Sequence, residues 1–234
     1  MTAEQLYEGK AKIVYATDDP KQVSQKFKDD ATAFDGKKKG SIADKGVRNA
    51  TISAYLFRVV EEAGVPTQLI EQTADDTLLT HYLDMFPVEV VVRNFAAGSI
   101  VKRLGFEEGQ KFSKPMVEYF LKDDSLGDPL ITCAHIEELG LITTDERNEI
   151  KELALRVNEA LSGFFAERGI ILVDFKLEFG RDKDGVIRLG DEISPDTCRL
   201  WDAETKKKLD KDRFRQDLGG VEDAYAEILE RVKS

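Results

Sequence analysis

Three charged side chains share one face of a strongly apolar segment, residues 170–180. The segment starts Ile-Ile-Leu-Val and then alternates, which places Asp174, Lys176 and Glu178 on one side of a predicted strand. That face either meets water, as on an amphipathic edge strand, or lines a polar cleft. The following strand returns antiparallel and carries Asp191 toward the level of Lys176 and Glu178. A carboxylate from each strand beside a lysine makes a hard oxygen site suited to Mg²⁺ and nucleotide phosphates.

A second group of residues has the chemistry of an anion site. The apolar run 86–92 predicts a buried strand that ends in Arg93, and a small-residue turn then leads to Ser99 at the start of a short helix. A helix N-terminus with a hydroxyl beside an arginine binds anions; alternatively, Ser99 only caps the helix and Arg93 only forms an ion pair. Arg199 follows the proposed metal site in sequence, where its guanidinium could clamp an anionic substrate.

The N-terminal segment contributes two more cations, Lys10 and Lys12, on one face of a predicted hairpin that turns at Gly9. The segment matches neither GxxxxGK[ST] nor GxGxxG, so the sequence contains no standard phosphate loop there. Taken alone, the pattern favours two solvated lysines. His81 and His135 are far apart and without obvious partners, so we expect no histidine-activated nucleophile.

The first half of the chain must supply a framework for these residues. We expect a helix over residues 19–27, because Asp-Pro is a typical helix start. A glycine- and lysine-rich loop is predicted over residues 35–46, and apolar residues at helical spacing predict a helix over residues 47–64. Short strands are predicted over residues 67–92.

In the second half, Thr143 and Glu146 form a capping box that begins a long helix ending at residues 168–169. A hairpin is predicted to turn at residues 184–185, and an amphipathic helix from Val221 closes the chain. Strands and helices do not alternate as in βαβ units. The pattern therefore favours an α+β fold with antiparallel sheets.

Composition limits the kinds of partner. The chain has 234 residues, of which 41% are hydrophobic and 34% charged, typical of a globular protein with a sizeable core. Its 45 acidic and 34 basic residues give a net charge of −11, which argues against nucleic-acid or membrane partners. The two cysteines, Cys133 and Cys198, lack metal-type spacing, and the N-terminus lacks a signal-peptide pattern. We therefore expect a cytoplasmic protein.

Several strings, in this order and spacing, resemble the SAICAR synthetase family across essentially the whole chain. They are LYEGKAK (6–12), FPVEVVVRNFAAGS (86–99), LVDFKLEFG (172–180), LGDEISPDTCRLWD (189–202) and KDRFRQDLGG (211–220). The resemblance implies a two-lobed α+β fold, distantly similar to protein kinases and ATP-grasp enzymes, with ATP in the cleft between the lobes. It divides the chain into an ATP-covering lobe, residues 1–86, and a lobe with the metal and ribonucleotide site, residues 87–234.

The resemblance also implies the reaction. Enzymes of this family use ATP to activate the carboxylate of an aminoimidazole carboxylate ribonucleotide. They then join that carboxylate to the amino group of L-aspartate and release ADP and phosphate, in de novo purine biosynthesis. The implied cofactors are ATP and Mg²⁺, the partners are these small molecules, and a homodimer is expected.

Residue roles follow from the matching positions. The nucleotide would be bound by Lys10, Lys12, Met85, Val88 and Glu89, with the strand around Met85 to Val88 contacting adenine through its backbone.

The remaining roles belong to the centre of the cleft and to the second substrate. Glu178 and Asp191 would hold Mg²⁺, while Asp174 and Lys176 would line the catalytic centre. The ribonucleotide would be bound by Arg93, Ser99 and Arg199.

Two other functions fit the residues alone. A small-molecule kinase of related fold would phosphorylate a hydroxyl instead of a carboxylate. A non-catalytic nucleotide-binding regulator would bind ATP without turnover and would not need both Glu178 and Asp191. ADP formation that requires both the ribonucleotide and aspartate separates the ligase from these alternatives.

Overall fold

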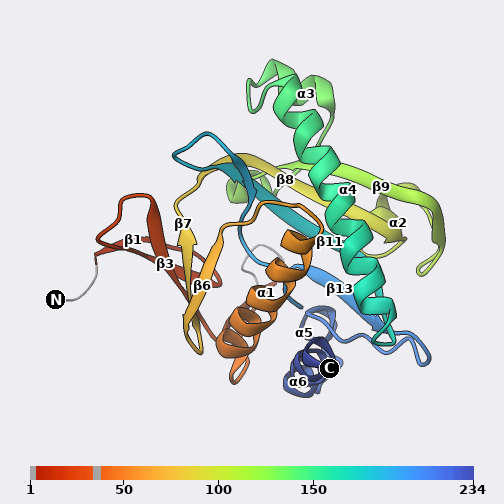
Figure 1. The fold of residues 1–234 in the computed structure, drawn as a ribbon. Coiled ribbons are helices and arrows are strands. Elements are labelled where there is room, and N and C mark those ends of the chain that lie inside the picture. Colours follow the sequence, from red (N-terminus) through yellow and green to blue (C-terminus); the bar gives the residue numbers. More distant parts are fainter. Residues whose placement is uncertain (1–3, 34–37) are drawn as a thin grey trace.

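Two large antiparallel sheets, one two-stranded sheet and a set of helices make up the described residues, 4–33 and 38–234, in a computed structural model of the chain (Figure 1). The five-stranded sheet, called the smaller sheet below, lies at the left in Figure 1 and is drawn in red to yellow. Within the described residues its strands are, in spatial order, β1 (Gln5–Glu8), β2 (Lys12–Ala16), β3 (Gln22–Phe27), β7 (Thr77–His81) and β6 (Leu69–Ala74).

The larger sheet carries most of the residues singled out above. Its strands are, in spatial order, β10 (Leu130–Ile131), β9 (Lys111–Leu121), β8 (Asp84–Phe95), β11 (Ile170–Arg181) and β12 (Ile187–Leu189), with β13 (Cys198–Asp202) also paired to β11. Strands β8 and β11 are therefore internal, and each has a neighbour on both edges.

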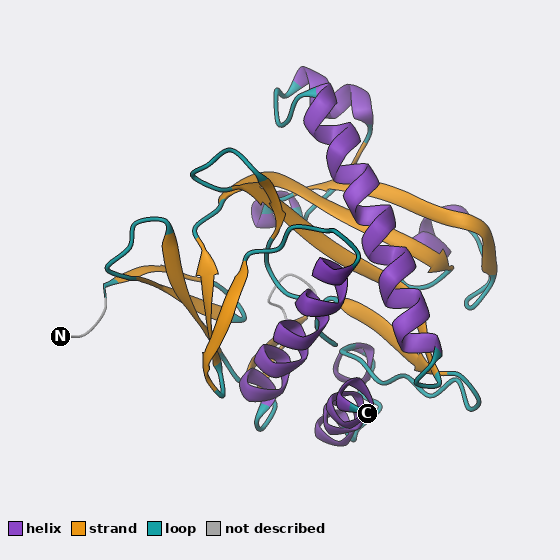
Figure 2. Cartoon of the chain, viewed as in Figure 1, coloured by secondary structure: helices purple, strands orange, loops and turns teal. Residues whose placement is uncertain are grey.

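The helices pack between and beside the sheets (Figure 2). They are α1 (Lys45–Glu62), α2 (Ser99–Leu104), α3 (Cys133–Glu138), α4 (Thr144–Ala166), α5 (Asp212–Arg215) and α6 (Val221–Lys233), with a 3₁₀ turn η1 (Asp124–Leu126). None of the helices in the described part of the chain is long and apolar enough to cross a membrane.

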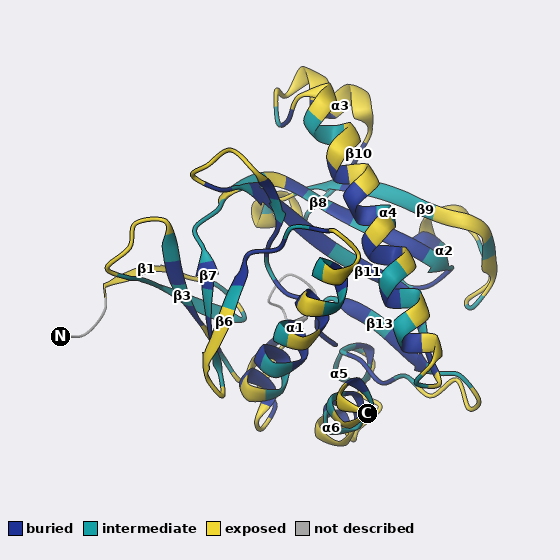
Figure 3. Ribbon diagram, viewed as in Figure 1, coloured by how far each residue is buried: buried dark blue, intermediate teal, exposed yellow. Residues whose placement is uncertain are grey.

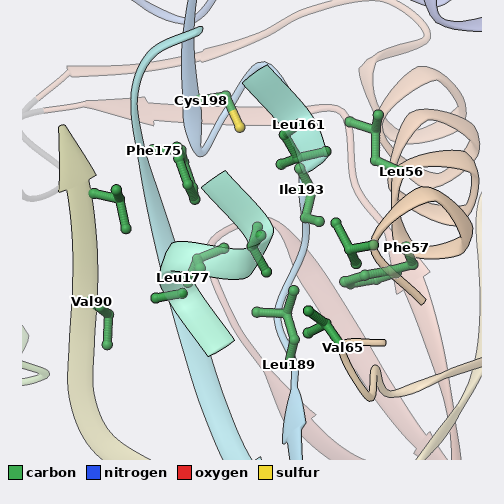
Figure 4. Close-up of a cluster of buried hydrophobic side chains, with 14 of the residues drawn as sticks. Leu56, Phe57, Val65, Val90, Leu161, Phe175, Leu177, Leu189, Ile193 and Cys198 are labelled. Atoms are coloured by element: carbon green, nitrogen blue, oxygen red, sulfur yellow. The ribbon is translucent and has the colours of Figure 1, made fainter. Parts of the chain in front are cut away.

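One hydrophobic core joins the two sheets through the helices. In Figure 4, Leu56 and Phe57 of α1 lie in the same cluster as Leu161 of α4 and Leu177 of β11. All four side chains are at most 1% exposed. Full burial of each such side chain contributes about 1.5–3 kcal/mol, so this cluster fixes β11 relative to the helices. Figure 3 shows β8 and β11 as largely buried strands beneath α4.

The helix predicted over residues 19–27 is wrong. Asp19 and Pro20 form only a turn, in which the Gln22 amide donates to the Asp19 carbonyl (2.9 Å), and β3 follows. The side chains of Val23, Gln25 and Phe27 alternate inward as in a strand. Positions four apart share a face in both a helix and a strand, so Val23 and Phe27 alone could not distinguish them.

The loop predicted over residues 35–46 is wrong in part. Residues 34–37 lie outside the described residues, but β5 (Lys38–Ser41) pairs with β4 (Asp30–Ala33). Helix α1 begins at Lys45, and the predicted helix over residues 47–64 is confirmed. A short antiparallel pair needs only backbone hydrogen bonds, so it leaves little trace in a lysine-rich sequence.

The later elements agree with the sequence. The Thr143 hydroxyl accepts from the Glu146 amide, and the Glu146 carboxylate accepts from the Thr143 amide (2.7 Å), which confirms the capping box. The hairpin turns at Gly185, whose φ is +89°, and α6 closes the chain. The border predicted between residues 86 and 87 falls inside β8, and the division into two lobes stays a prediction.

Candidate active site

Strand β11 carries its charges in the interior of the larger sheet. Asp174 and Glu178 are 3% and 5% exposed, so β11 is not an amphipathic edge strand. Asp174 pairs with Arg93 of β8, and Glu178 pairs with Glu89. The register therefore places functional candidates from two distant parts of the sequence directly opposite one another.

The ammonium of Lys176 joins three carboxylates. Its Nζ lies 3.2 Å from Oε1 of Glu89 and 3.1 Å from Oδ2 of Asp191, and it also donates to Oε1 of Glu178. Burial alone would lower the pKa of Lys176, but the charges of Asp191, Glu178 and Glu89 outweigh burial and raise the pKa well above its ordinary value. Lys176 is therefore a fixed positive charge at the centre of an acidic cluster.

Lys12 reaches the same cluster from the smaller sheet. Its Nζ lies 2.5 Å from Oδ1 of Asp191 and 3.4 Å from Oε1 of Glu192, and its side chain is 13% exposed. Burial opposes its charge, but Asp191 and Glu192 raise its pKa overall. The interpretation of Lys12 as a solvated lysine is wrong.

The backbone at Asp191 is held in an unusual conformation. Its φ is +55°, in the left-handed region that aspartate tolerates better than most residues. The Gly190 amide donates to the Glu178 carbonyl (2.8 Å), and Nε2 of buried Gln68 donates to the Asp191 carbonyl (2.8 Å). These bonds hold the Asp191 carboxylate beside Lys12 and Lys176, which lower its pKa against the effect of burial.

The donor set at this cluster fits a magnesium ion that is bound together with a nucleotide. Glu178 and Asp191 both bond to the single ammonium of Lys176, so their oxygens are close enough to share one cation. Among the described residues, no group of three or more His, Cys, Asp or Glu side chains is arranged to hold a metal. Mg²⁺ commonly takes one or two carboxylates and completes its shell with phosphate oxygens and water.

The other predicted nucleotide residues lie outside this cluster. Nζ of Lys10 is 2.6 Å from Oδ1 of Asp124 in η1, and both side chains are about half exposed or more. Val88 is buried in the core, while Met85 packs near Gly180, where an added Cβ would lie 3.0 Å from its sulfur. The β8–β11 register shifts along this stretch, so its backbone departs from a regular ladder.

Near Asp174 of β11, the neighbouring basic residues are arginines: Arg93 on β8 and Arg199 on β13. Arg93 is 3% exposed; its Nε donates to Glu118 (2.6 Å) and its Nη1 to Asp174 (2.6 Å). Its Nη2 donates to Oγ of Ser99 (3.2 Å). Ser99 makes no capping bond to α2, because Gly98 occupies the N-cap position and Ser99 is the first residue of the helix. Arg93 therefore forms ion pairs with Glu118 and Asp174, and the capping interpretation of Ser99 is wrong.

Arg199 packs against a glycine that sequence reasoning did not single out. Its Nη1 donates to both oxygens of Asp174 (3.0 and 2.9 Å), and its Nε donates to Asp212 (2.9 Å). A Cβ added at Gly98 would lie 2.4 Å from Nη2 of Arg199, and Gly98 has φ +62° and ψ −128°. Both the close approach and the backbone conformation require glycine there.

The residues described so far form two clusters: the lysine cluster of Lys12, Lys176, Glu178 and Asp191, and the arginine cluster of Arg93, Asp174 and Arg199. A cavity of about 340 Å³ is lined by members of both clusters. Of the predicted site residues, its lining brings together Glu89, Arg93, Ser99, Asp174, Lys176 and Arg199. Lys12, Glu178 and Asp191 connect to it through Lys176, whereas Lys10, Met85 and Val88 do not line it.

Sequence reasoning missed several residues of the cavity and its border. Asp128, Asp196, Lys211 and Arg215 line the cavity, and Lys122 bonds to Glu178. Asp196, Lys211 and Arg215 lie inside the strings that carried the family resemblance, so their position there was an available signal. The sequence around Asp128 and Lys122 contained no such signal.

Asp196 is held from three sides. Nζ of Lys45 lies 2.9 Å from its Oδ2, and the Tyr225 hydroxyl donates to its Oδ1 (2.5 Å). Burial opposes its charge, but Lys211 and Lys45 lower its pKa. Burial raises the pKa of the neighbouring Cys198 thiol to about 12, which disfavours the nucleophilic thiolate form.

The fold and the site together define an α+β protein with lysines and arginines around one polar cavity, an arrangement typical of ATP-dependent ligases and small-molecule kinases. The model of one family, SAICAR synthetase, matches residues 5–232. The chain therefore belongs to the SAICAR synthetase family. Enzymes of this family catalyse the ATP-dependent ligation of aspartate to a carboxylated aminoimidazole ribonucleotide in purine biosynthesis.

Relatives match over nearly their whole length. A phosphoribosylaminoimidazole-succinocarboxamide synthase from Pelodictyon phaeoclathratiforme is 59% identical over 97% of this chain and 96% of its own. The crystal structure of the synthase from Ehrlichia chaffeensis has a TM-score of 0.96 at 44% identity, covering 98% of both chains. A SAICAR synthetase in complex with ADP has a TM-score of 0.94 at 53% identity, covering 97% of this chain and 96% of that one. The predicted family, the α+β fold and the class of enzyme are confirmed.

Proposed function

We propose that this chain joins L-aspartate to the carboxylate of 5-amino-1-(5-phospho-D-ribosyl)imidazole-4-carboxylate, with conversion of ATP to ADP and phosphate. One observation carries the proposal: Lys176 both bonds to the metal-compatible pair Glu178 and Asp191 and lines the arginine-rich cavity. A phosphoryl group would thus meet its acceptor at the point where the two clusters join.

The nucleotide belongs to the lysine cluster. Lys12 and Lys176 supply fixed positive charge for the triphosphate, and Lys10 approaches from the covering hairpin. The adenine would lie against the strand from Met85 to Val88, whose irregular pairing with β11 leaves backbone groups for hydrogen bonds. Glu89 adjoins this strand and bonds to Lys176.

Glu178 and Asp191 would hold Mg²⁺ together with phosphate oxygens. Bound there, the ion would neutralise charge that develops on the transferred phosphoryl group. The two carboxylates now share lysine ammonium groups, so nucleotide binding offers those lysines phosphate oxygens in exchange.

The ribonucleotide belongs to the arginine cluster. Its phosphate and its carboxylate need dedicated partners in a protein of net charge −11. Arg93 and Arg199 supply guanidinium forks, which match such groups with parallel hydrogen bonds, and Ser99 adds a hydroxyl. Asp174 bonds to both arginines and so fixes them relative to each other.

The chemistry follows from this arrangement. A carboxylate is a poor electrophile, and phosphorylation gives it a good leaving group for attack by the amino group of aspartate. Lys176 lies between the clusters and would stabilise the negative charge shared by the transferred phosphoryl group and its acceptor oxygen.

An assay of ADP release tests the proposed function. We expect ADP to form only when both the ribonucleotide and L-aspartate are present. ADP formed with a hydroxyl acceptor, or ATP binding without turnover, would instead support a small-molecule kinase or a nucleotide-binding regulator. The cytoplasmic location and the homodimer stay predictions, and light scattering of the purified chain checks the latter.

A further inference from the structure

A second layer of carboxylates lies behind the arginine cluster. Asp212 accepts from Nε of Arg199 (2.9 Å) through Oδ2 and from Nη1 of Arg215 (2.7 Å) through Oδ1. Its side chain is 4% exposed. One carboxylate thus holds two arginines that line the cavity but come from β13 and α5.

Asp210 ties those two elements together. It is fully buried; its Oδ2 accepts from the Leu200 amide (2.8 Å) and its Oδ1 from the Asp212 amide (2.7 Å). Leu200 directly follows Arg199, and Asp212 begins α5. Both oxygens are therefore used to fix the backbone on either side of the arginine pair.

We propose that Asp210 and Asp212 are positioning residues that together orient Arg199 and Arg215 toward the ribonucleotide. The inference rests on the proposed function, because it takes the arginine cluster as the ribonucleotide site. Neither carboxylate needs to touch the substrate: Asp210 fixes the backbone of β13 and α5, and Asp212 fixes the two guanidinium groups.

Asp210 fixes the backbone at a cost in folding stability, because its carboxylate is buried close to that of Asp212. Burial and then the charge of Asp212 raise the pKa of Asp210 to about 7, although the amides of Asp212 and Leu200 and the charge of Arg199 oppose the rise. The thiol of Cys198 and the hydroxyl of Tyr225 also face it from β13 and α6.

The sign of the effect on stability follows from the raised pKa. Between the ordinary value of 3.8 and about 7, the folded chain holds a proton on Asp210 that the unfolded chain has lost. Stability therefore falls as the pH rises through this window, and the ionised carboxylate destabilises the fold above it.

The substitution Asp210→Asn separates the two roles. The asparagine side chain has one acceptor oxygen, so only one of the two backbone amides could still donate to it. The other backbone N–H would face the side-chain NH₂ group, which is also a donor, and the link between β13 and α5 would loosen. We expect the KM for the ribonucleotide to rise roughly 10- to 100-fold, as for a small misplacement of binding groups, with the KM for ATP unchanged. At pH 8 the removal of the destabilising buried charge offsets the loss of this bond, so we expect the melting temperature not to fall.

A matched control is Asp202, at the end of β13, the strand that carries Arg199. Asp202 also accepts from a backbone amide, that of Thr205 (2.8 Å), and it bonds to Arg231 away from the cavity. These bonds lower its pKa, so Asp202→Asn should lower the melting temperature and leave both KM values unchanged. The opposite patterns of the two variants would distinguish positioning from support of the fold.

Two further variants make the test decisive. Should Asp210→Asn fail to fold, Asp212→Asn replaces it, with the same expected rise in the ribonucleotide KM. If Arg199→Lys raises that KM and neither aspartate variant does, the positioning role is overturned while the proposed function stands. If Arg199→Lys leaves that KM unchanged, the assignment of the arginine cluster is wrong, and the inference falls with it.

Discussion

The cleft contains two charge clusters that are built differently. In one, the ammonium groups of Lys12 and Lys176 share the carboxylates of Asp191 and Glu178. In the other, each guanidinium makes several directed bonds, as Arg199 does to Asp174 and Asp212. A lysine ammonium is a point charge on a flexible stem, whereas a guanidinium is a rigid fork.

This difference has a functional consequence. Lysines can exchange carboxylate oxygens for phosphate oxygens and follow charge as it moves during phosphoryl transfer. Arginines that are locked on both sides are suited to hold an anion in one place. For this reason we propose the nucleotide at the lysine cluster and the second substrate at the arginine cluster.

The largest expected effect comes from the lysine cluster. Asp191→Asn replaces the carboxylate that Lys12 and Lys176 share, and that we propose as a ligand of Mg²⁺, by a neutral amide, which is a weaker ligand for a hard cation. We expect turnover to fall roughly a hundredfold or more in a steady-state assay of ADP release. Asp184→Asn, on the exposed tip of the same hairpin, should retain normal turnover. Turnover near the normal rate in Asp191→Asn would remove Asp191 from the site.

The next effect concerns the arginine cluster. Arg199→Lys keeps the charge but loses the fork, so we expect the KM for the ribonucleotide to rise roughly 10- to 100-fold, as for the loss of one charge-assisted bond. The KM for ATP should change less than about twofold. An equal rise in both constants would place Arg199 beside the nucleotide instead.

A glycine tests the packing behind Arg199. Gly98→Ala would push a methyl group into Nη2 of Arg199, so we expect the KM for the ribonucleotide to rise about tenfold. Gly105→Ala is the matched control, because Gly105 also has a positive φ but nothing lies within 4 Å of its added Cβ. Backbone strain alone lowers the melting temperature of both variants; a raised KM in both would mean that displacement of Arg199 is not the cause.

The smallest effect is expected at the covering hairpin. Lys10 pairs with Asp124 near the surface, where solvent weakens its contribution. Lys10→Ala should raise the KM for ATP roughly three- to tenfold and leave the KM for the ribonucleotide unchanged. Lys21→Ala removes a similarly exposed ion pair, with Asp184, and serves as the control. Equal kinetics in the two variants would mean that Lys10 does not contact the nucleotide.

Local patterns predicted the parts of the site that lie on one strand. Alternation along β11 placed Asp174, Lys176 and Glu178 on one face, because the side-chain period of a strand is local. The hairpin also brought Asp191 back to them, as its bond to Lys176 shows. The helix predicted over residues 19–27 failed because two apolar residues four apart fit both periods.

The rest depends on tertiary contacts that no local pattern encodes. The close approach of Gly98 to Arg199 joins segments about a hundred residues apart. The bond from Lys122 to Glu178 depends on where β9 ends beside β8, the strand that separates it from β11. Such pairs follow from the register of distant strands, which a single sequence does not determine.

Calorimetric titration of two variants with two ligands tests the division of the cleft most directly. Asp191→Asn and Arg199→Lys would each be titrated with ATP in the presence of Mg²⁺ and, separately, with the ribonucleotide. We expect a crossed pattern, in which Asp191→Asn loses affinity for ATP alone and Arg199→Lys loses affinity for the ribonucleotide alone. Loss of affinity for both ligands in both variants would contradict the division into a lysine half and an arginine half.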